Sequence, residues 1–142
     1  MTLFLDTEFN GFGGDLISIA LVSDYGRKCD EFYAVRAIPE LPTPFVQEHV
    51  LPVLGVKPLS DAVLQRKLLD YLHRHKGELI VMDWYEDLTH FLNLLGTDPG
   101  WAYRLDLSFR LINPGEPLYS KVPHNALHDA RALMQWYLGR AP

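Results

Sequence analysis

The chain has 142 residues, of which 48% are hydrophobic and 22% charged, as is ordinary for one globular domain with its own core. Its net charge of −5 argues against a general polyanion-binding protein, because affinity for phosphate backbones normally comes from Lys and Arg. No apolar run approaches the length of a membrane span, the start lacks the features of a signal peptide, and a lone Cys29 cannot form an internal disulfide. We therefore expect one soluble domain, residues 1–142, in a reducing cytoplasm.

The first predicted element is a buried strand over residues 3–9, LFLDTEF, in which two acids interrupt an apolar run. Side chains on a strand repeat their direction every two residues, so Asp6 and Glu8 share one face. Two neighbouring carboxylates that lose hydration repel each other, and a bound divalent cation would offset both costs. An ordinary strand end that emerges into solvent is the alternative that these residues alone leave open.

Three antiparallel strands are predicted to open the fold. Residues 10–14 form a glycine-rich turn, and residues 15–36 form a hairpin whose turn is expected at residues 24–27 and whose returning strand covers residues 32–35. The spacings of a dinucleotide-binding motif or a P-loop are absent, so we interpret the glycines as a hairpin connection rather than a phosphate site.

The proline-rich segment that follows is limited to short helices, one of them over residues 45–51. Ser60 is expected to cap a longer helix that ends at Gly77. His73 and His75 lie near its end, where the helix dipole favours His; two residues apart on a helix, they diverge too far to share a metal. The predicted inner face of this helix consists of Ala62, Leu64, Leu68, Leu69 and Leu72.

A short apolar strand over residues 77–83 and a helix over residues 85–96 form a predicted βα unit. Residues 101–113 are interpreted as a strand that runs into a short helix capped by Asp106, and residues 113–123 as a loop. An antiparallel start followed by a βα unit indicates an α/β fold with a mixed sheet flanked by helices. The inner face of the helix is expected to contain Leu88, Phe91, Leu92 and Leu95.

The last predicted helix begins after Asn125, a suitable N-cap, and stops at Gly139. Asp129 falls on its apolar stripe together with Ala126 and Ala130, two small residues that would let the helix approach a sheet closely. A lone carboxylate on a core-facing stripe is expensive unless it is paired or coordinates a metal. The helix dipole explains the position of Asp129 in the first turn but not its face.

His124 lies five residues before Asp129, where its ring can turn towards whatever Asp129 holds. The combination of Asp-Thr-Glu on the first strand with the H-x-x-x-x-D spacing resembles the DEDDh 3′-to-5′ exonucleases of the ribonuclease H-like fold. Within that group, the DTEF start and the HNALHDA ending are most similar to the small exoribonuclease AS branch, and the resemblance covers nearly the whole chain. A sister group has Tyr four residues before the last Asp, where this chain has Asn125, so the His version is indicated.

The third carboxylate of this family follows the strand of the βα unit, often in the pattern Asn-x-x-Phe-Asp. Here Asp87 matches the Asp, Asp83 stands at the Asn position, and Glu86 replaces the Phe, so the motif departs from its usual form. We assign the role to Asp87. Asp83 is its rival, and an ordinary acid in the first turn of a helix is the further alternative.

The resemblance implies hydrolysis of phosphodiester bonds with two metal ions, and release of nucleoside 5′-monophosphates. Carboxylate ligands suit Mg²⁺ or Mn²⁺, whereas zinc would want Cys or more than one well-placed His. His124 would act as the general base, since an imidazole can accept a proton near neutral pH. The implied metal ligands and catalytic carboxylates are Asp6, which would bridge the ions, Glu8 and Asp129 at one ion, and Asp87 at the other.

The expected partner is the 3′ end of a single-stranded nucleic acid, with RNA favoured by the resemblance. A homodimer is compatible with the same resemblance, and no membrane partner is expected. A DNA proofreading-type exonuclease and an inactive nucleic-acid-binding domain that kept the fold are the alternatives. Aromatic residues suited either to base stacking or to the core are Phe9, Phe12, Trp84, Tyr85 and Phe109.

Overall fold

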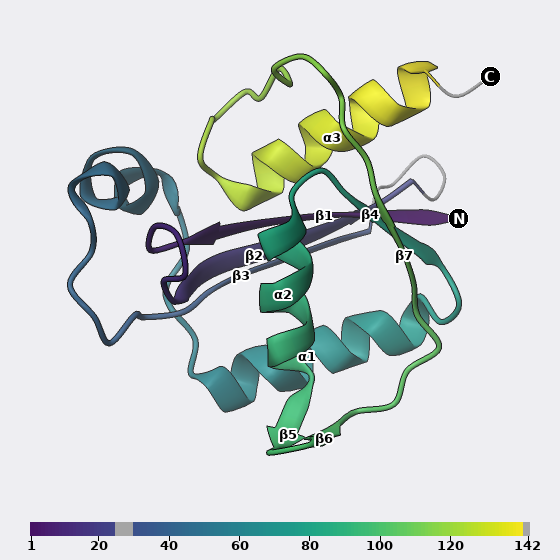
Figure 1. The fold of residues 1–142 in the computed structure, drawn as a ribbon, viewed down its shortest axis with the longest axis horizontal. Coiled ribbons are helices and arrows are strands. Elements are labelled where there is room, and N and C mark those ends of the chain that lie inside the picture. Colours follow the sequence, from purple (N-terminus) through teal and green to yellow (C-terminus); the bar gives the residue numbers. More distant parts are fainter. Residues whose placement is uncertain (25–29, 141–142) are drawn as a thin grey trace.

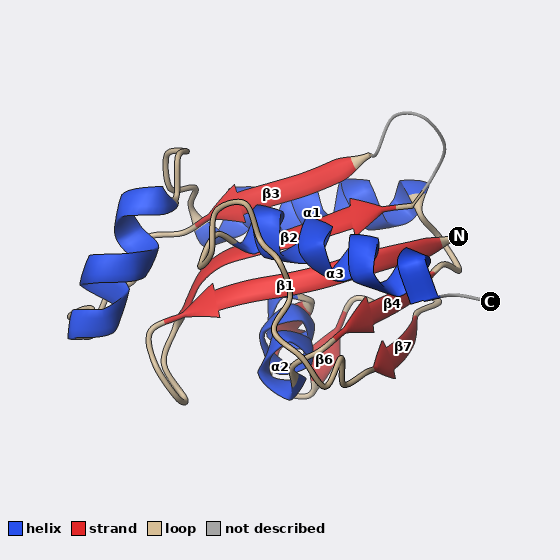
Figure 2. Cartoon of the chain, turned by 90° about the horizontal axis from the view of Figure 1, so that it is seen from above, coloured by secondary structure: helices blue, strands red, loops and turns tan. Residues whose placement is uncertain are grey.

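The computed structural model describes residues 1–24 and 30–140, which form an α/β structure around a five-stranded mixed sheet (Figure 1). Its strands are β1 (Thr2–Phe9), β2 (Leu16–Ser23), β3 (Glu31–Val35), β4 (Leu79–Met82) and β7 (Ser108–Leu111). They lie in the order β3-β2-β1-β4-β7, which Figure 2 shows from above. The first three strands pair antiparallel, whereas β4 is parallel to β1 and β7 is parallel to β4. The predicted mixed sheet is therefore confirmed, and most of the hairpin turn predicted at residues 24–27 lies outside the described residues.

Helices cover both faces of this sheet. The helices α1 (Asp61–Arg74) and α2 (Tyr85–Leu94) lie on one face, and α3 (Ala126–Arg140) lies on the other (Figure 1). The alternation along β1 explains both contacts, because Leu3 and Leu5 pack on the α1 and α2 side while Phe4 packs against α3. Between β3 and α1 the chain forms a π-helical turn, η1 (Val46–Val50), and a 3₁₀ turn, η2 (Leu51–Val53), near the predicted short helix.

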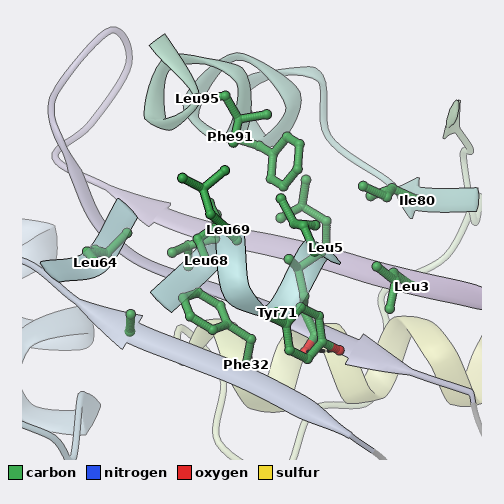
Figure 3. Packing of buried hydrophobic residues seen from close by; sticks show 14 of the residues in the cluster. Leu3, Leu5, Phe32, Leu64, Leu68, Leu69, Tyr71, Ile80, Phe91 and Leu95 are labelled. Carbon is green, nitrogen blue, oxygen red and sulfur yellow. Dashed lines mark hydrogen bonds between the residues drawn. The ribbon is translucent and has the colours of Figure 1, made fainter. Parts of the chain in front are cut away.

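The larger core lies between the sheet and the helices α1 and α2. Figure 3 shows Leu5 between the rings of Phe91 and Tyr71, all of which are fully buried. Burial of each such side chain contributes about 1.5 to 3 kcal/mol relative to its exposure. The hydroxyl of Tyr71, an inner residue that the leucine pattern did not include, donates to the Asp30 carbonyl at 2.9 Å.

The packing of α3 follows the sequence prediction. Ala126 and Ala130 are completely buried against Ala20 and Val22 of β2, so small side chains bring the helix close to the sheet. The Asn125 side chain accepts hydrogen bonds from the backbone N–H groups of residues 127 and 128, at 3.1 and 3.3 Å, as an N-cap does. Gly139 does not end the helix, which continues to residue 140.

The segment after α2 differs from its prediction. Asp106 caps no helix; it lies in a loop between a two-stranded sheet, formed by β5 (Gly96–Asp98) and β6 (Trp101–Ala102), and β7. The residues expected to form a helix instead pair with β4, from Leu79 opposite Ser108 to Met82 opposite Leu111. The parallel ladder satisfies the backbone groups that a helix would otherwise have satisfied.

Two helix faces also need correction. Leu92 is 44% exposed because it lies about 100° around α2 from the buried Phe91, and Ala62 is exposed on α1. His75 lies at the end of α1, as predicted; it is also buried, and its ring lies between Asp30 at 2.8 Å and Glu78 at 3.0 Å. No helix in the described part of the chain is both long and apolar enough to cross a membrane.

Candidate metal centre and active site

The predicted site residues meet at the end of the two central parallel strands. In the register of β1 and β4, Phe4 stands opposite Val81, and its continuation brings Asp6 beside Asp83 at the point where β4 ends. The carboxyl ends of neighbouring parallel strands are where α/β sheets usually bind ligands. The helix α2 begins two residues after Asp83, so its first turn reaches the same edge.

One group of carboxylates joins β1 to α3. Oxygen atoms of Asp6, Glu8 and Asp129 lie within 4.8 Å of one another. The first two come from one face of β1, as predicted, and the third comes from the first turn of α3, next to the buried Ala130. Close contact between α3 and β2 therefore carries the third carboxylate to the other two.

A second group shares Asp6 and joins β1 to the βα unit. Oxygen atoms of Asp6, Asp83 and Asp87 also lie within 4.8 Å of one another. Asp87 is 2% exposed, and its Oδ1 atom accepts hydrogen bonds from the backbone N–H of Thr7 at 3.1 Å and from the Thr7 hydroxyl at 2.6 Å. Asp83 and Asp87, the two candidates for the third carboxylate, thus both lie beside Asp6, and Asp87 is the one that is hydrogen-bonded to β1.

These carboxyl groups resist ionisation in the absence of a cation. Burial, followed by the negative charges of Asp87 and Glu8, raises the pKa of Asp6 well above its usual range. Burial and the charge of Asp129 raise the pKa of Glu8 to about 8, and burial raises the pKa of Asp87 to about 7. Burial also raises the pKa values of Asp83 and Asp129. The site therefore stabilises positive charge.

The donor set fits a divalent cation. The Oδ2 atoms of Asp6 and Asp87 are buried and have no hydrogen-bond partner among the described residues. Buried carboxylate oxygens are costly unless they are paired or bind a metal. Hard oxygen ligands of this kind suit Mg²⁺ or Mn²⁺, and the sharing of Asp6 between two groups suits two neighbouring ions.

His124 stands beside this acidic group with a strained backbone. Its φ angle is +65°, and no other non-glycine residue in the described ranges 1–24 and 30–140 has a positive φ. Such a conformation costs on the order of 1 to 3 kcal/mol and persists where the surroundings hold it. Here the His124 backbone N–H donates to Asp129 Oδ2 at 3.0 Å, which fixes the backbone of His124 relative to the carboxylates. The neighbouring His128 faces away and lines a separate hollow with Lys121 and Arg131.

Two hollows flank the carboxylates. The acidic cleft, of about 780 Å³, is lined by Asp6, Asp83, Trp84, His124 and Asp129 and by the loop of residues 111–118. The apolar hollow, of about 420 Å³, is lined by Glu8, Phe9, Phe12, Phe45 and Trp84, with Val46 and Val50. Trp84 belongs to both, so one exposed indole separates the charged side of the site from the apolar side.

The predicted aromatic residues divide between surface and core. Phe12 is 88% exposed and Trp84 52% exposed, so both rings are accessible from solvent at the apolar hollow. Tyr85 lines the acidic cleft beside them. Phe109 instead packs edge to face on Phe91, 5.8 Å away between ring centroids, and belongs to the core.

Comparison with protein-family models and with curated proteins finds no match for this chain. The resemblance to the DEDDh exonucleases therefore depends on the motif residues themselves and on how their side chains are arranged.

Sequence reasoning missed two parts of the site. Thr7 lies between Asp6 and Glu8 in the Asp-Thr-Glu motif and received no role. Side chains on a strand alternate between its two faces, so the Thr7 side chain faces α2, where it donates to Asp87. Phe45 and His49 were not expected near the site, because the segment that carries them follows β3 and returns to the end of β1 only in three dimensions.

Proposed function

We propose that this protein is a metal-dependent 3′-to-5′ exonuclease of the DEDDh type, with RNA as its favoured substrate. The observation that carries the proposal is the pair of carboxylate groups that share Asp6, with His124 beside them. The strand order β3-β2-β1-β4-β7 supports a ribonuclease H-like fold, in which three antiparallel strands precede the βα units. Acids that lie at the end of one strand by chance would not be expected to meet acids from two separate helices, as those of β1, α2 and α3 do here.

The carboxylates would hold two cations, Mg²⁺ or Mn²⁺. Asp6 would be shared, with Glu8 and Asp129 on one side and Asp83 and Asp87 on the other. When bound, such ions neutralise the phosphoryl oxygens and stabilise the leaving oxygen of a phosphodiester. Thr7 would keep Asp87 oriented, since a hydrogen bond to one carboxylate oxygen leaves the other free to act as a ligand.

His124 would act as general base towards the attacking water. The imidazole accepts one proton of the water, while the water oxygen forms the new bond to phosphorus. The bond between phosphorus and the 3′ oxygen of the preceding nucleotide breaks, and that oxygen takes a proton from solvent water to become the new 3′ hydroxyl, while the imidazolium of His124 returns its proton to solvent. The products are a nucleoside 5′-monophosphate and a chain one nucleotide shorter, so atoms and charge balance without a further reactant.

The apolar hollow supports a nucleic-acid substrate. It lies directly beside Glu8 and offers Phe9, Phe12, Phe45 and Trp84 to a terminal base, which commonly stacks between aromatic faces in single-strand recognition. The described residues that line the acidic cleft include no Lys or Arg, so affinity would come from stacking and from the cations. The preference for RNA over DNA follows from the resemblance to the exoribonuclease AS branch.

A gel assay of end-labelled oligonucleotides tests this proposal. Single-stranded RNA and DNA of one sequence are incubated with the protein in Mg²⁺, Mn²⁺ or EDTA, with Asp6→Asn as the matched inactive variant. We expect a ladder that shortens RNA from the 3′ end with either cation and no cleavage in EDTA or with Asp6→Asn. Faster cleavage of DNA would favour the proofreading-type enzyme, and binding without cleavage would favour the inactive domain. Undiminished cleavage in EDTA would contradict the proposal.

A further inference from the structure

The ring of His124 is held by aromatic contacts. Its centroid lies 5.0 Å from that of Phe45 in an edge-to-face arrangement and 5.9 Å from that of His49, and these two rings are 4.7 Å apart. We call Phe45, His49 and His124 the three-ring cluster. Among the residues that the structure describes, no hydrogen bond is made to a ring nitrogen of His124. Its orientation therefore depends on ring packing, whereas a general base is more often oriented by a hydrogen bond from a third group.

The segment that supplies two of these rings is tied to the residue next to His124. The Asn125 side chain, only 6% exposed, donates to the Val53 carbonyl at 2.8 Å and to the Tyr33 hydroxyl at 3.3 Å. The Tyr33 hydroxyl in turn donates to the Leu54 carbonyl at 2.9 Å. In Figure 1 this segment is the blue coil at the left, close to the start of α3. A shift of η2, which directly follows η1, relative to α3 would thus break partly buried hydrogen bonds.

The shape of η1 also points to a role at the site. It is a single π-helical turn, a conformation that is rare and frequently found at functional sites. Val46 and Val50 on this turn are buried against Ile17, while the side chain of His49, which is 44% exposed, turns to Phe45 and His124. One face of the turn therefore anchors it, and the other carries the rings.

We propose that His49 is a positioning residue, which acts with Phe45 to hold the His124 imidazole in the orientation that accepts a proton from the attacking water. The inference rests on the proposed role of His124. His49 lines neither the acidic cleft nor the apolar hollow, so its effect can be separated from substrate binding. Phe45 lines the apolar hollow as well, and a base seated there would touch the same ring that orients His124.

Steady-state kinetics on the RNA substrate with Mn²⁺ test this role. His49→Ala should lower kcat by about tenfold to a hundredfold, the range expected when a catalytic group is displaced by about an ångström, and change KM less than twofold. His49→Phe keeps a flat ring at the contact and should restore kcat. His73→Ala, an exposed His on α1, is the matched control and should leave both constants unchanged.

The decisive comparison repeats His49→Ala in a His124→Ala background. If His49 acts through His124, the second substitution should change kcat no further. An equal loss in both backgrounds, an equal defect in His49→Phe and His49→Ala, or an unchanged kcat in His49→Ala would each overturn the proposal. Its exposure makes His49 a substitution that the fold should tolerate, and a thermal melt verifies this.

The mobility of the His124 ring can be measured without any cleavage reaction. In the metal-free protein, ¹H–¹³C NMR of the imidazoles should show ring-current shifts at His124 from Phe45 and His49 and restricted ring motion, both reduced by His49→Ala and kept by His49→Phe. An unchanged His124 spectrum in His49→Ala would overturn the proposal even if the protein cleaved no RNA. A wild type with an ordered His124 ring and no cleavage would instead contradict the proposed function alone.

Discussion

The raised pKa values in the carboxylate groups predict that the metal-free protein loses stability as the pH rises. Folding raises the pKa of Glu8 from its usual 4.5 to about 8, mainly by burial, so the folded state binds its proton more tightly than the unfolded state does. Stability is therefore unaffected below about pH 4.5 and falls as the pH rises through the window up to about pH 8.

The magnitude follows from the same values. At roughly 1.4 kcal/mol per pH unit, ionisation of Glu8 in the folded state alone costs at most about 5 kcal/mol at high pH. Solvent screening of this partly exposed group reduces the cost, and we expect roughly 2 to 3 kcal/mol. Because Glu8 and Asp87 repel each other, protonation of one relieves the other, so their costs do not add. In a domain of this size, the melting temperature should fall by about 5 to 10 °C.

Thermal unfolding at pH 5, 7 and 9, in EDTA and in Mn²⁺, measures this effect. In EDTA the melting temperature should fall across the series; Mn²⁺ should raise it, and by more at pH 9 than at pH 5, because the cation binds the ionised carboxylates. Glu8→Gln should flatten the slope in EDTA, whereas Asp70→Asn, which replaces an exposed acid on α1, should not. A melting temperature in EDTA that stays constant or rises from pH 5 to pH 9 would show that folding does not raise the pKa values of these carboxyl groups.

Three further predictions concern single side chains. His124→Ala should lower turnover by about 10² to 10⁴, as expected for loss of a general base. His128→Ala should change turnover little, because the His128 ring faces a separate hollow. Equal losses in single-turnover assays of the two variants would contradict the assignment of His124 as the base. Asp87→Asn should nearly abolish cleavage, because Asp87 is the carboxylate that Thr7 holds beside Asp6. Asp83→Asn, which places the Asn that is usual at this position of the resembled motif, should retain substantial activity. The reverse outcome in the gel assay would transfer the main role to Asp83. His75→Ala should cost about 2 to 3 kcal/mol in denaturant unfolding, because it leaves the mostly buried carboxylate of Glu78 without its ring partner. It should leave kcat unchanged, because His75 lies at the opposite end of the sheet. An unchanged stability would mean that this contact contributes nothing.

Much of the fold could be predicted because its signals are local. The alternation in residues 3–9 sets which side chains of β1 face α3, and the i, i+3, i+4 spacing around Asp129 sets which side of α3 faces the sheet. Asn125 satisfies its own helix terminus within three residues. Each feature depends on neighbours in the chain, so the sequence carries it directly.

The errors arose where distant partners decide the structure. Residues 108–111 become a strand because β4 offers them a parallel edge, which no local pattern around Asp106 reveals. The contact of the His75 ring with Asp30, which lies 45 residues earlier in the chain, is likewise not evident from the residues around the helix end. The assignment of the third carboxylate to Asp87 stays a prediction, because the register of β1 with β4 brings Asp83 to Asp6 and the first turn of α2 brings Asp87 there as well.

The number of cations that Asp6 holds distinguishes a two-metal site from any other use of these carboxylates. Titration of the metal-free protein with Mn²⁺, followed by electron paramagnetic resonance in the presence of a nucleoside 5′-monophosphate, counts bound ions and detects magnetic coupling between them. We predict two coupled Mn²⁺ ions per chain in the wild type, about 3.5 to 4 Å apart, and loss of the coupled signal in Asp6→Asn. A wild type that binds no Mn²⁺, or a coupled signal that survives in Asp6→Asn, would contradict a two-metal site centred on Asp6.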